Sequence, residues 1–406
     1  MNYTSEEVME YMQEEDVKFI RLAFADVFGV QKNISIMPGE LERAFQYGIA
    51  FDASAIAGFG DEAFSDLFLM PEKETLMPLP WRPEHGRVVQ MFAEILKPDG
   101  SIFPCDTRAL LKEAVNEAEK AGFRFSFGGE QEFYLFRLDD QGLPTKIPHD
   151  TAGYMDVFPE DLGENVRREI CLTLEQMGIR PESSHHEEGP GQNEIDFRYA
   201  DPVSAADQVM MFRRVVKTIA KRNGLYADFS PKPLKDGPGN GFHINMSLSG
   251  DQDPAVIRSA IAGILEHARE MTLFLNPSEM SFHRLGRNKA PRYISWSREN
   301  RSQLVRIPAA SGEYQRLELR SPDPLANPYL AFRLMILAAL SGIRERLPLS
   351  APADFNLYTA APELLSAFKK LPESLDEAGR IAKASPFITS VIPEAVLASY
   401  IARSGL

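Results

Sequence analysis

The sequence predicts an α+β protein with a small N-terminal domain and a large catalytic-type domain. The chain has 406 residues, too many for one compact core, because domains usually contain roughly 100–200 residues. Proline and glycine residues interrupt the pattern between positions 98 and 104, so we place the boundary near residue 105, with domains at 1–105 and 106–406. Strands that alternate with helices after this boundary indicate one large α+β domain.

Local signals predict the elements of the first domain in order. Thr4 is followed three residues later by Glu7, a capping pattern that begins a short N-terminal helix. Apolar runs at 17–24 and 87–95 predict two strands, and loops that contain glycine and proline separate them. Together these elements predict a small α+β unit.

Aspartates begin most of the helices expected in the second domain. Asp106 caps a helix that runs to Lys120 and stops at Gly122. Apolar periodicity predicts further helices at 161–177, 202–223, 254–274 and 327–345, the first three beginning near Asp161, Asp201 and Asp253. Alternating or continuous apolar runs predict strands at 124–136, 181–187, 193–199, 225–230, 241–248, 292–297 and 314–320.

The charge balance argues against nucleic acid and membrane surfaces as partners. The chain carries 44 Lys and Arg against 58 Asp and Glu, a formal charge of −14, whereas lysine and arginine supply the main attraction to phosphates. Its longest apolar stretch, near residues 334–340, is well short of the ~20 residues that cross a bilayer. Cys105 and Cys171 form no metal-type motif, and the acidic N-terminus does not read as a secretory signal, so we expect a cytoplasmic protein.

Alternation along the predicted strands places polar residues on shared faces. Successive side chains of a strand point to opposite faces, so residues two apart share one. Glu130 therefore shares a face with Glu132, and Glu187 shares one with His185. The other shared sets are His243 with Asn245 and Ser247, Glu194 with Asp196 and Arg198, and Glu318 with Arg316 and Arg320.

Two interpretations of these faces are open. They are either the solvated faces of an antiparallel sheet or, if the strands are neighbours, the lining of one cavity. Histidine, asparagine and serine beside a glycine-rich loop favour the cavity, which would be lined by Glu130, Glu132, Glu187, Glu194, Glu318 and His243. Carboxylates at close range need cations, and an oxygen-rich ligand set suits Mg²⁺ or Mn²⁺ rather than zinc. The arginines would then hold an anionic substrate or a developing phosphate.

The loop at 232–241 leads directly into the strand that carries His243. Its glycines permit close approach of the backbone to a ligand, and exposed amides in such a turn bind anions. It lacks the Walker pattern of phosphate-binding loops, and taken alone a glycine-rich segment is more often a simple turn.

Read together, these segments resemble the glutamine synthetase family, and specifically its bacterial type I branch, over nearly the whole chain. The most specific match is the ATP-region signature, formed by residues 232–234, 238–243 and Ser247. Further matching segments are 51–56, 130–133, 185–187, 191–194, 300–302, 306–308, 316–320, 323–324 and 327–329. The resemblance implies a β-grasp-like N-terminal domain and a catalytic domain whose antiparallel sheet carries the metal and ATP sites.

The resemblance also implies the chemistry, an ATP-dependent ligation with at least two Mg²⁺ or Mn²⁺ ions and a γ-glutamyl phosphate intermediate. It implies Glu132, Glu187 and Glu194 as ligands of one ion and Glu130, His243 and Glu318 as ligands of the other. The remaining implied roles are glutamate binding by Gly239, Arg284 and Arg320, nucleotide binding by Lys232, Ser247 and Arg316, phosphate stabilisation by Arg301 and Arg306, and an ammonium contact from Asp52 of a neighbouring subunit.

One departure from the family pattern concerns the nucleophile. Just before Ala290 the family usually has a glutamate that helps to take a proton from ammonium, whereas this chain has Lys289 in a slightly shortened loop. A lysine would repel ammonium. Ala53 and Ala55 also replace the usual glycine and serine beside Asp52, so the nucleophile pocket is altered while the other parts are complete.

We therefore expect synthesis of glutamine from glutamate, ATP and ammonia. A γ-glutamyl amide ligase that uses an organic amine is the alternative, and a non-catalytic binding or regulatory role is disfavoured because every metal-ligand position is retained. The resemblance implies a homo-oligomer with active sites between subunits, either a hexameric ring or a stacked-ring dodecamer, since the C-terminal segment is short. Tyr358 is expected to be structural.

Overall fold

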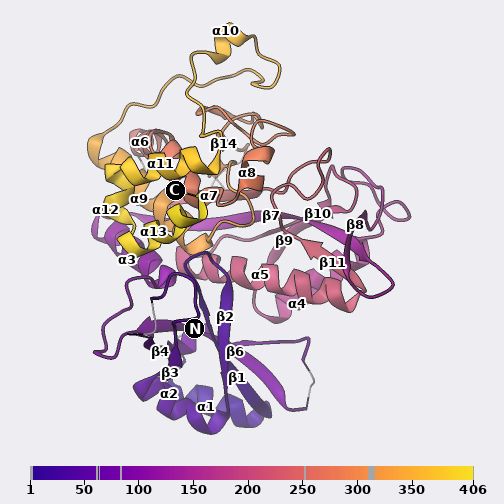
Figure 1. Ribbon diagram of the computed structural model, residues 1–406, viewed down its shortest axis with the longest axis vertical. Coiled ribbons are helices and arrows are strands. Elements are labelled where there is room, and N and C mark those ends of the chain that lie inside the picture. The colour runs from indigo at the N-terminus through magenta and orange to yellow at the C-terminus, as the bar shows by residue number, and fades with distance from the viewer. Residues whose placement is uncertain are drawn as a thin grey trace.

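The computed structural model describes residues 3–60, 63, 65–82, 85–250, 253–309 and 316–405. Two separate sheets organise it, one in the N-terminal part and one in the larger part that follows (Figure 1). The N-terminal part, indigo to purple, lies below the rest of the molecule in this view. Within the described part of the chain, no helix combines the length and the apolar character that a bilayer crossing needs.

The N-terminal sheet has the strand order β2-β1-β6-β4-β3, and β5 also pairs with β6. Its central pair, β1 with β6, is parallel, and the other pairs are antiparallel. The strands are β1 Val17–Ala25, β2 Gln31–Ile36, β3 Ile49–Asp52, β4 Asp66–Pro71, β5 Met77–Pro78 and β6 Arg87–Leu96. The helices are α1 Ser5–Glu14 and α2 Leu41–Tyr47, with 3₁₀ turns at Pro38–Glu40 and Lys73–Thr75.

Side-chain caps fix the helix starts that the sequence predicts. Thr4 Oγ1 accepts a hydrogen bond from the Glu7 backbone N–H (3.1 Å), and Glu7 Oε2 accepts one from the Thr4 N–H (2.6 Å). Asp106 caps α3 through the backbone N–H groups of Arg108 and Ala109. The second carboxylate oxygen of Asp106 accepts the N–H of Ile95 (2.9 Å), which joins the end of β6 to α3 at the domain junction.

The catalytic sheet has the strand order β13-β14-β15-β12-β7-β10-β9, with β11 and β8 also pairing with β7. Every pair is antiparallel except β13 with β14. The strands are β7 Arg124–Leu138, β8 Pro144–Pro148, β9 Pro181–His186, β10 Gln192–Phe197, β11 Leu225–Asp228, β12 Phe242–Ser249, β13 Trp296–Arg298, β14 Val305–Ile307 and β15 Leu317–Leu319.

Helices cover the face of this sheet that points away from the polar residues, and α9 is buried along most of its length. They are α3 Thr107–Lys120, α4 Glu164–Gln176, α5 Pro202–Arg222, α6 Pro254–Glu266, α7 Ala268–Leu275, α8 Glu279–Arg284, α9 Pro328–Glu345, α10 Pro362–Leu365, α11 Leu375–Ala384, α12 Pro386–Val391 and α13 Glu394–Arg403. In Figure 1, α5 runs between the catalytic sheet and the N-terminal part, and the C-terminal helices lie beside α9.

Several boundaries differ from the sequence-based expectations. The helix expected at 161–177 begins at Glu164, because the Asp161 carboxylate accepts the Gly163 N–H (2.9 Å) and pairs with Arg167. The helix expected at 254–274 is broken at His267 into α6 and α7. The strand expected at 292–297 is reduced to β13. Of the strand expected at 314–320, residues 314 and 315 lie outside the described residues, and β15 covers Leu317–Leu319.

Candidate active site

The strand order brings the predicted polar faces together. Strands β15, β12, β7, β10 and β9 are consecutive neighbours in the catalytic sheet. Glu130 lies opposite His243 on one side and opposite Asp196 on the other, and Glu132 lies opposite Glu194. In the same way, Asn245 lies opposite Glu318, and His185 lies opposite Glu194. Because cross-strand partners point to the same face, these side chains form one polar surface. Glu132, Glu194, His243, Asn245 and Glu318 are buried there, so the solvated-face alternative is wrong for them.

Within this surface, two groups of side chains have the spacing of a metal site. Potential ligand atoms of Glu130, Glu194 and His243 all lie within 4.8 Å of one another, and so do those of His185, Glu187 and Glu194. Glu194 belongs to both groups, so its carboxylate lies between the two positions. The grouping implied by the family pattern set Glu194 with Glu132 and Glu187 only, whereas the geometry also brings it to Glu130 and His243.

Burial and mutual repulsion disfavour the charged state of these carboxylates. Burial, followed by Asp196 and Glu132, raises the pKa of Glu194 well above its usual value. Burial is also the main cause that raises the pKa values of Glu132 and Glu187. A bound cation would oppose all three effects. The donor set of carboxylate oxygens with one histidine fits Mg²⁺ or Mn²⁺.

His243 completes this donor set in its neutral form. Its Nδ1 lies 3.3 Å from Glu130 Oε2 and 3.7 Å from Glu318 Oε1. Burial and then the positive charge of Arg320 lower the pKa of His243 to about 3. A neutral imidazole retains a lone pair for a metal ion.

Three arginines flank the carboxylates. Arg306 donates to Glu318 Oε2 (2.8 Å), and Arg320 forms an ion pair with Glu318 from the other side. The Nε atoms of Arg306 and Arg320 are buried and have no hydrogen-bond partner among the described residues. Arg301 is exposed, but it acts electrostatically on Glu187. The site thus contains guanidinium groups that remain available to an anionic ligand.

The glycine-rich loop packs directly against Arg284. A methyl group on Gly239 would lie 2.5 Å from the Pro231 carbonyl oxygen and 2.8 Å from Arg284 Cγ, so only glycine fits there. Arg284 is buried and donates to the Ser321 carbonyl (2.8 Å). Lys232 donates to the carbonyl of Gly237 within the loop. The predicted pair Gly239 and Arg284 is therefore brought together.

The residues expected on the nucleotide side lie along β12 and next to it. Arg316 donates to Asn245 Oδ1 (3.1 Å), and its guanidinium lies 6.0 Å from the centre of the Tyr199 ring. Arg316, Asn245 and Tyr199 line a small cavity of about 210 Å³, and Glu130 and Asp196 also belong to its lining. Ser247 is two residues further along β12, opposite Ser126, and is not among the residues that line this cavity.

Asp52 is not brought to this surface within one chain. It ends β3 in the N-terminal sheet, where its carboxylate accepts the Ser54 N–H (2.9 Å). Lys289, in contrast, lies at the site. It forms an ion pair with Glu188, next to Glu187, and its ammonium lies 5.4 Å from the centre of the Tyr154 ring.

Four residues of the site were absent from the predicted set. His185 Nε2 lies 3.4 Å from Glu194 Oε1, and Asp196 faces Glu130; strand alternation had placed both on the right faces. Gln192 donates to Glu132 (3.1 Å) and to the Gly239 carbonyl (3.1 Å), which links β10 to the glycine-rich loop. Tyr358, expected to be structural, is close enough to Arg320 and Arg284 for their charges to act on its hydroxyl. Nothing local in the sequence signals that last contact.

Comparisons with known proteins agree with this architecture. The family model described as the glutamine synthetase β-grasp domain matches residues 16–98, and the one described as the glutamine synthetase catalytic domain matches residues 104–404. A protein named glutamine synthetase from Methanosarcina mazei is 43% identical over 98% of this chain and 92% of its own length. Another from Clostridium saccharobutylicum is 40% identical over 98% of this chain and 94% of its own length.

Solved structures show the same fold. A complex of a protein named GmaS with ADP has a TM-score of 0.88 and 28% identity, covering 98% of this chain and 94% of that one. Glutamine synthetase from Plasmodium falciparum has a TM-score of 0.86 at 22% identity over 100% and 95% of the two chains, a likeness of fold alone. The expected α+β class, with its β-grasp domain and larger catalytic domain, is confirmed. The chain belongs to the glutamine synthetase family.

Proposed function

We propose that this protein is an ATP-dependent ligase that joins ammonia to the γ-carboxylate of glutamate and so makes glutamine. The supporting observation is that carboxylate and histidine side chains carried by five neighbouring strands, flanked by arginines, meet on one face of the sheet. This arrangement occurs in a chain that is 40–43% identical, over nearly its full length, to proteins named glutamine synthetase.

A carboxylate is a poor electrophile, and phosphorylation supplies the leaving group that it lacks. The γ-phosphoryl group of ATP passes to a γ-carboxylate oxygen of glutamate and leaves ADP behind. Ammonia then attacks the carbonyl carbon of this acyl phosphate, the new C–N bond forms, and the C–O bond to phosphate breaks to release inorganic phosphate. The proton that ammonium must lose before attack goes to a carboxylate near the nucleophile.

The residues divide these tasks. We assign Glu132, Glu187 and Glu194 to one Mg²⁺ or Mn²⁺ ion and Glu130, His243 and Glu318 to a second, with Glu194 close to both. When bound, such ions neutralise negative charge on the phosphoryl group. Arg301 and Arg306 would stabilise the transferred phosphate, Gly239, Arg284 and Arg320 would hold glutamate, and Lys232, Ser247 and Arg316 would bind the nucleotide.

Ammonia requires an acidic residue at the position of the nucleophile, and the chain offers two. Asp52, contributed by a neighbouring subunit of a ring-shaped homo-oligomer, is the first. Glu188 is the second, because its ion pair with Lys289 places it at the same loop. Glu188 thereby supplies the carboxylate that position 289 lacks. We expect the assembly to be a hexamer or a dodecamer and its location to be the cytoplasm.

A γ-glutamyl amide ligase that uses an organic amine is the second candidate. The observation that favours it is the positive charge of Lys289 beside Glu187. An organic amine that binds as a neutral or apolar group needs no anionic trap, so a lysine is better tolerated there.

One assay separates the candidates. Purified protein receives ATP, Mg²⁺ and glutamate with either ammonium, methylamine or ethylamine, and phosphate release is measured. We expect turnover with ammonium, and the Glu194→Gln variant provides the background rate. Turnover only with an amine would replace the glutamine proposal by the second candidate, and no turnover with any nucleophile would reject both.

A further inference from the structure

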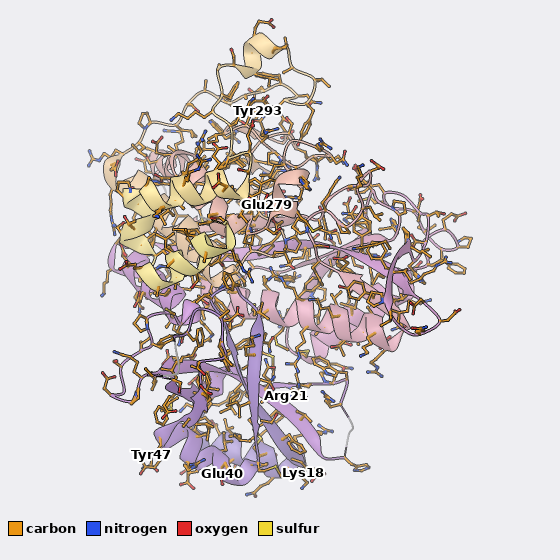
Figure 2. All side chains as sticks on the ribbon, viewed as in Figure 1. Lys18, Arg21, Glu40, Tyr47, Glu279 and Tyr293 are labelled. Carbon is orange, nitrogen blue, oxygen red and sulfur yellow. The ribbon has the colours of Figure 1, made fainter. Side chains whose placement is uncertain are left out.

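A second cavity, rich in arginine and lysine, lies between the two domains and away from the carboxylate site. Its volume is about 970 Å³, and its walls come from β1, the turn after it, Trp81, α5 and the segment around Pro324. Two cations, Arg21 and Arg82, face it from the N-terminal domain, and Figure 2 labels Arg21 there. Five more come from one helix, α5, namely Arg213, Arg214, Lys217, Lys221 and Arg222.

The described lining of the cavity supplies no counter-charge, although the buried Asp323 acts on Arg213 from outside the lining. No aspartate or glutamate is among the lining residues that the structure describes. Within the same described ranges, no ion pair joins any of the seven cations to a carboxylate, although the chain as a whole has a formal charge of −14. Asp228 acts on Lys217 but is itself paired with Lys146 at 2.6 Å. A cluster of like charges destabilises the free protein unless something else requires it.

Three of the arginines repel one another. Burial first, and then the charges of Arg21 and Arg82, lower the pKa of Arg214 to about 10. Lys221 and Arg222 have a structural explanation, because cations stabilise the C-terminal end of a helix. Arg21, Arg82, Arg214 and Lys217 lie outside that explanation.

The cations of α5 are held in place by neutral partners. Arg214 donates to Gln90, and its guanidinium lies 5.5 Å from the centre of the Trp81 ring. Lys217 lies 5.7 Å from the centre of the Phe229 ring. Neutral and aromatic partners orient a cation without cancelling its charge, so the cavity is preorganised for an anion.

We propose that this interdomain cavity binds a small anion that carries at least two negative groups. Arg21 and Arg82 contact one end of the anion from the N-terminal domain, and Arg214 and Lys217 contact the other end from α5. Carboxylate and phosphate groups share the required chemistry, since both accept charge-assisted hydrogen bonds from guanidinium groups. The anion thereby bridges the two domains.

Arg213 links the cavity to the carboxylate site on the opposite face of the sheet. Its Nε donates to Gln131 Oε1 (3.2 Å), and Gln131 lies between Glu130 and Glu132 on β7. Its guanidinium also lies 5.5 Å from the ring of Phe242, the residue before His243, and donates to the Ala326 carbonyl (3.2 Å). A bound anion that attracts Arg213 therefore acts on the two strands that carry three of the proposed metal ligands.

The test compares two double variants of the full chain. In Arg21→Gln/Arg82→Gln, the cavity loses its N-terminal cations. In the matched control, Lys18→Gln/Arg43→Gln, the same domain loses two exposed cations that are paired with Asp16 (2.6 Å) and Glu40 (2.8 Å). Binding of malonate and of pyrophosphate, each with two negative groups, is measured by isothermal titration calorimetry at constant ionic strength, because salt screens such contacts.

We expect the wild type and the control to bind at least one of the two anions, and the Arg21/Arg82 variant to bind it at least about tenfold more weakly. Malonate binding would identify a polycarboxylate ligand, and pyrophosphate binding one that bears phosphate groups. Equal affinities of all three proteins, or no binding by the wild type, would overturn the proposal. A change of oligomeric state in the Arg21/Arg82 variant without anion binding would show that a second copy of the chain occupies the cavity, and would also overturn it.

Thermal unfolding without ligand provides an independent readout. Loss of Arg21 and Arg82 should leave the Tm unchanged or raise it, because repulsion with Arg214 is relieved. A lower Tm would mean that these arginines serve the domain interface itself, contrary to the proposal. The link through Arg213 predicts that a saturating anion changes the Kd for Mn²⁺, with chelation by the anion measured separately. An unchanged Kd would reject the link.

Discussion

Neighbouring residues of β7 have different tasks because their side chains point to opposite faces of the sheet. Glu130 and Glu132 reach the polar surface beside His243 and Glu194. Gln131, between them, is fully buried on the other face and accepts a hydrogen bond from Arg213 of α5. A substitution at Gln131 would therefore shift Glu130 and Glu132, two proposed metal ligands, through the backbone of β7, although Gln131 itself faces the other side of the sheet.

Lys289 adds a positive charge beside Glu187, where we propose that the nucleophile enters. Both Asn288 and Lys289 adopt positive φ angles, 45° and 64°, in the left-handed region that favours glycine and asparagine. The ion pair with Glu188 and the Tyr154 ring hold the lysine in this conformation.

Lys289→Glu should improve the use of ammonium. A unit charge roughly 10 Å away contributes about 1–2 kcal/mol at an effective dielectric constant of about 20, so we expect the ammonium KM to fall by about tenfold. Steady-state kinetics with varied ammonium check this. Lys289→Gln, which removes the positive charge without adding a negative one, should lower the KM less. An unchanged or higher KM for Lys289→Glu would show that position 289 does not face the nucleophile.

Among the secondary-structure elements, helices α6 and α9 approach each other closely because each has a glycine at the contact. A methyl group on Gly263 would lie 2.1 Å from the Ala338 carbonyl oxygen, and one on Gly342 would lie 2.1 Å from the Ser259 carbonyl oxygen. Both obstacles are backbone atoms, which cannot rotate away as a flexible side chain can. Glycine within a helix normally lowers helix stability, and here the close packing explains its presence.

Gly263→Ala should therefore destabilise the protein although alanine is the better helix former. We expect a loss of about 1–3 kcal/mol or more, the usual range for overpacking a core, seen as a lower midpoint in urea unfolding. Gly39→Ala is the matched control, since a methyl group there meets no atom within 4 Å. If the two variants unfolded at the same urea concentration, the helix contact would be looser than described.

In the molecule as a whole, a network of ion pairs joins the N-terminal domain to the larger domain. Glu72 of the N-terminal domain accepts from Arg108 (2.6 Å) and pairs with Lys112, both on α3. Arg108 in turn donates to both carboxylate oxygens of Asp207 on α5, each at 2.9 Å. Burial alone would raise the pKa of Glu72, but Arg108 and Lys112 hold it below its usual value of 4.5.

Glu72→Gln should weaken this junction in a pH-dependent way. A depressed pKa contributes stability above the unfolded value of 4.5, and this contribution is lost as the pH falls through the lower folded value. We expect the variant to be less stable than the wild type by about 1–3 kcal/mol at pH 7, with the difference shrinking below pH 4.5. Urea unfolding across this pH range measures it. Glu74→Gln, on the same turn but exposed, should show no such effect, and a gap independent of pH would argue against the ion pair.

Parts of the fold and site were predictable because their causes are local. Caps such as Thr4 and Asp106 act on residues three positions away or fewer, so they reveal helix starts. Strand alternation correctly placed Glu130 with Glu132 and His243 with Asn245. The capping argument was wrong about Asp161 as the start of a helix. Its carboxylate instead accepts the Gly163 N–H and pairs with Arg167, and this arrangement depends on tertiary packing. The strands β2, β4 and β14 were not predicted, although β2 and β4 are as long as β9 and β10, which were.

The sequence by itself determined the fold class, the faces of the strands and the residue types of the site, because each depends on the periodic geometry of one segment. Only the tertiary structure decided that Glu194 lies between two candidate metal positions, that Lys289 pairs with Glu188, and that cations of both domains face one cavity. These contacts join residues far apart in the chain. These contacts form only when the strands pair in this order and the domains pack together. Burial of the whole core determines that arrangement, and it cannot be read from one segment of the sequence.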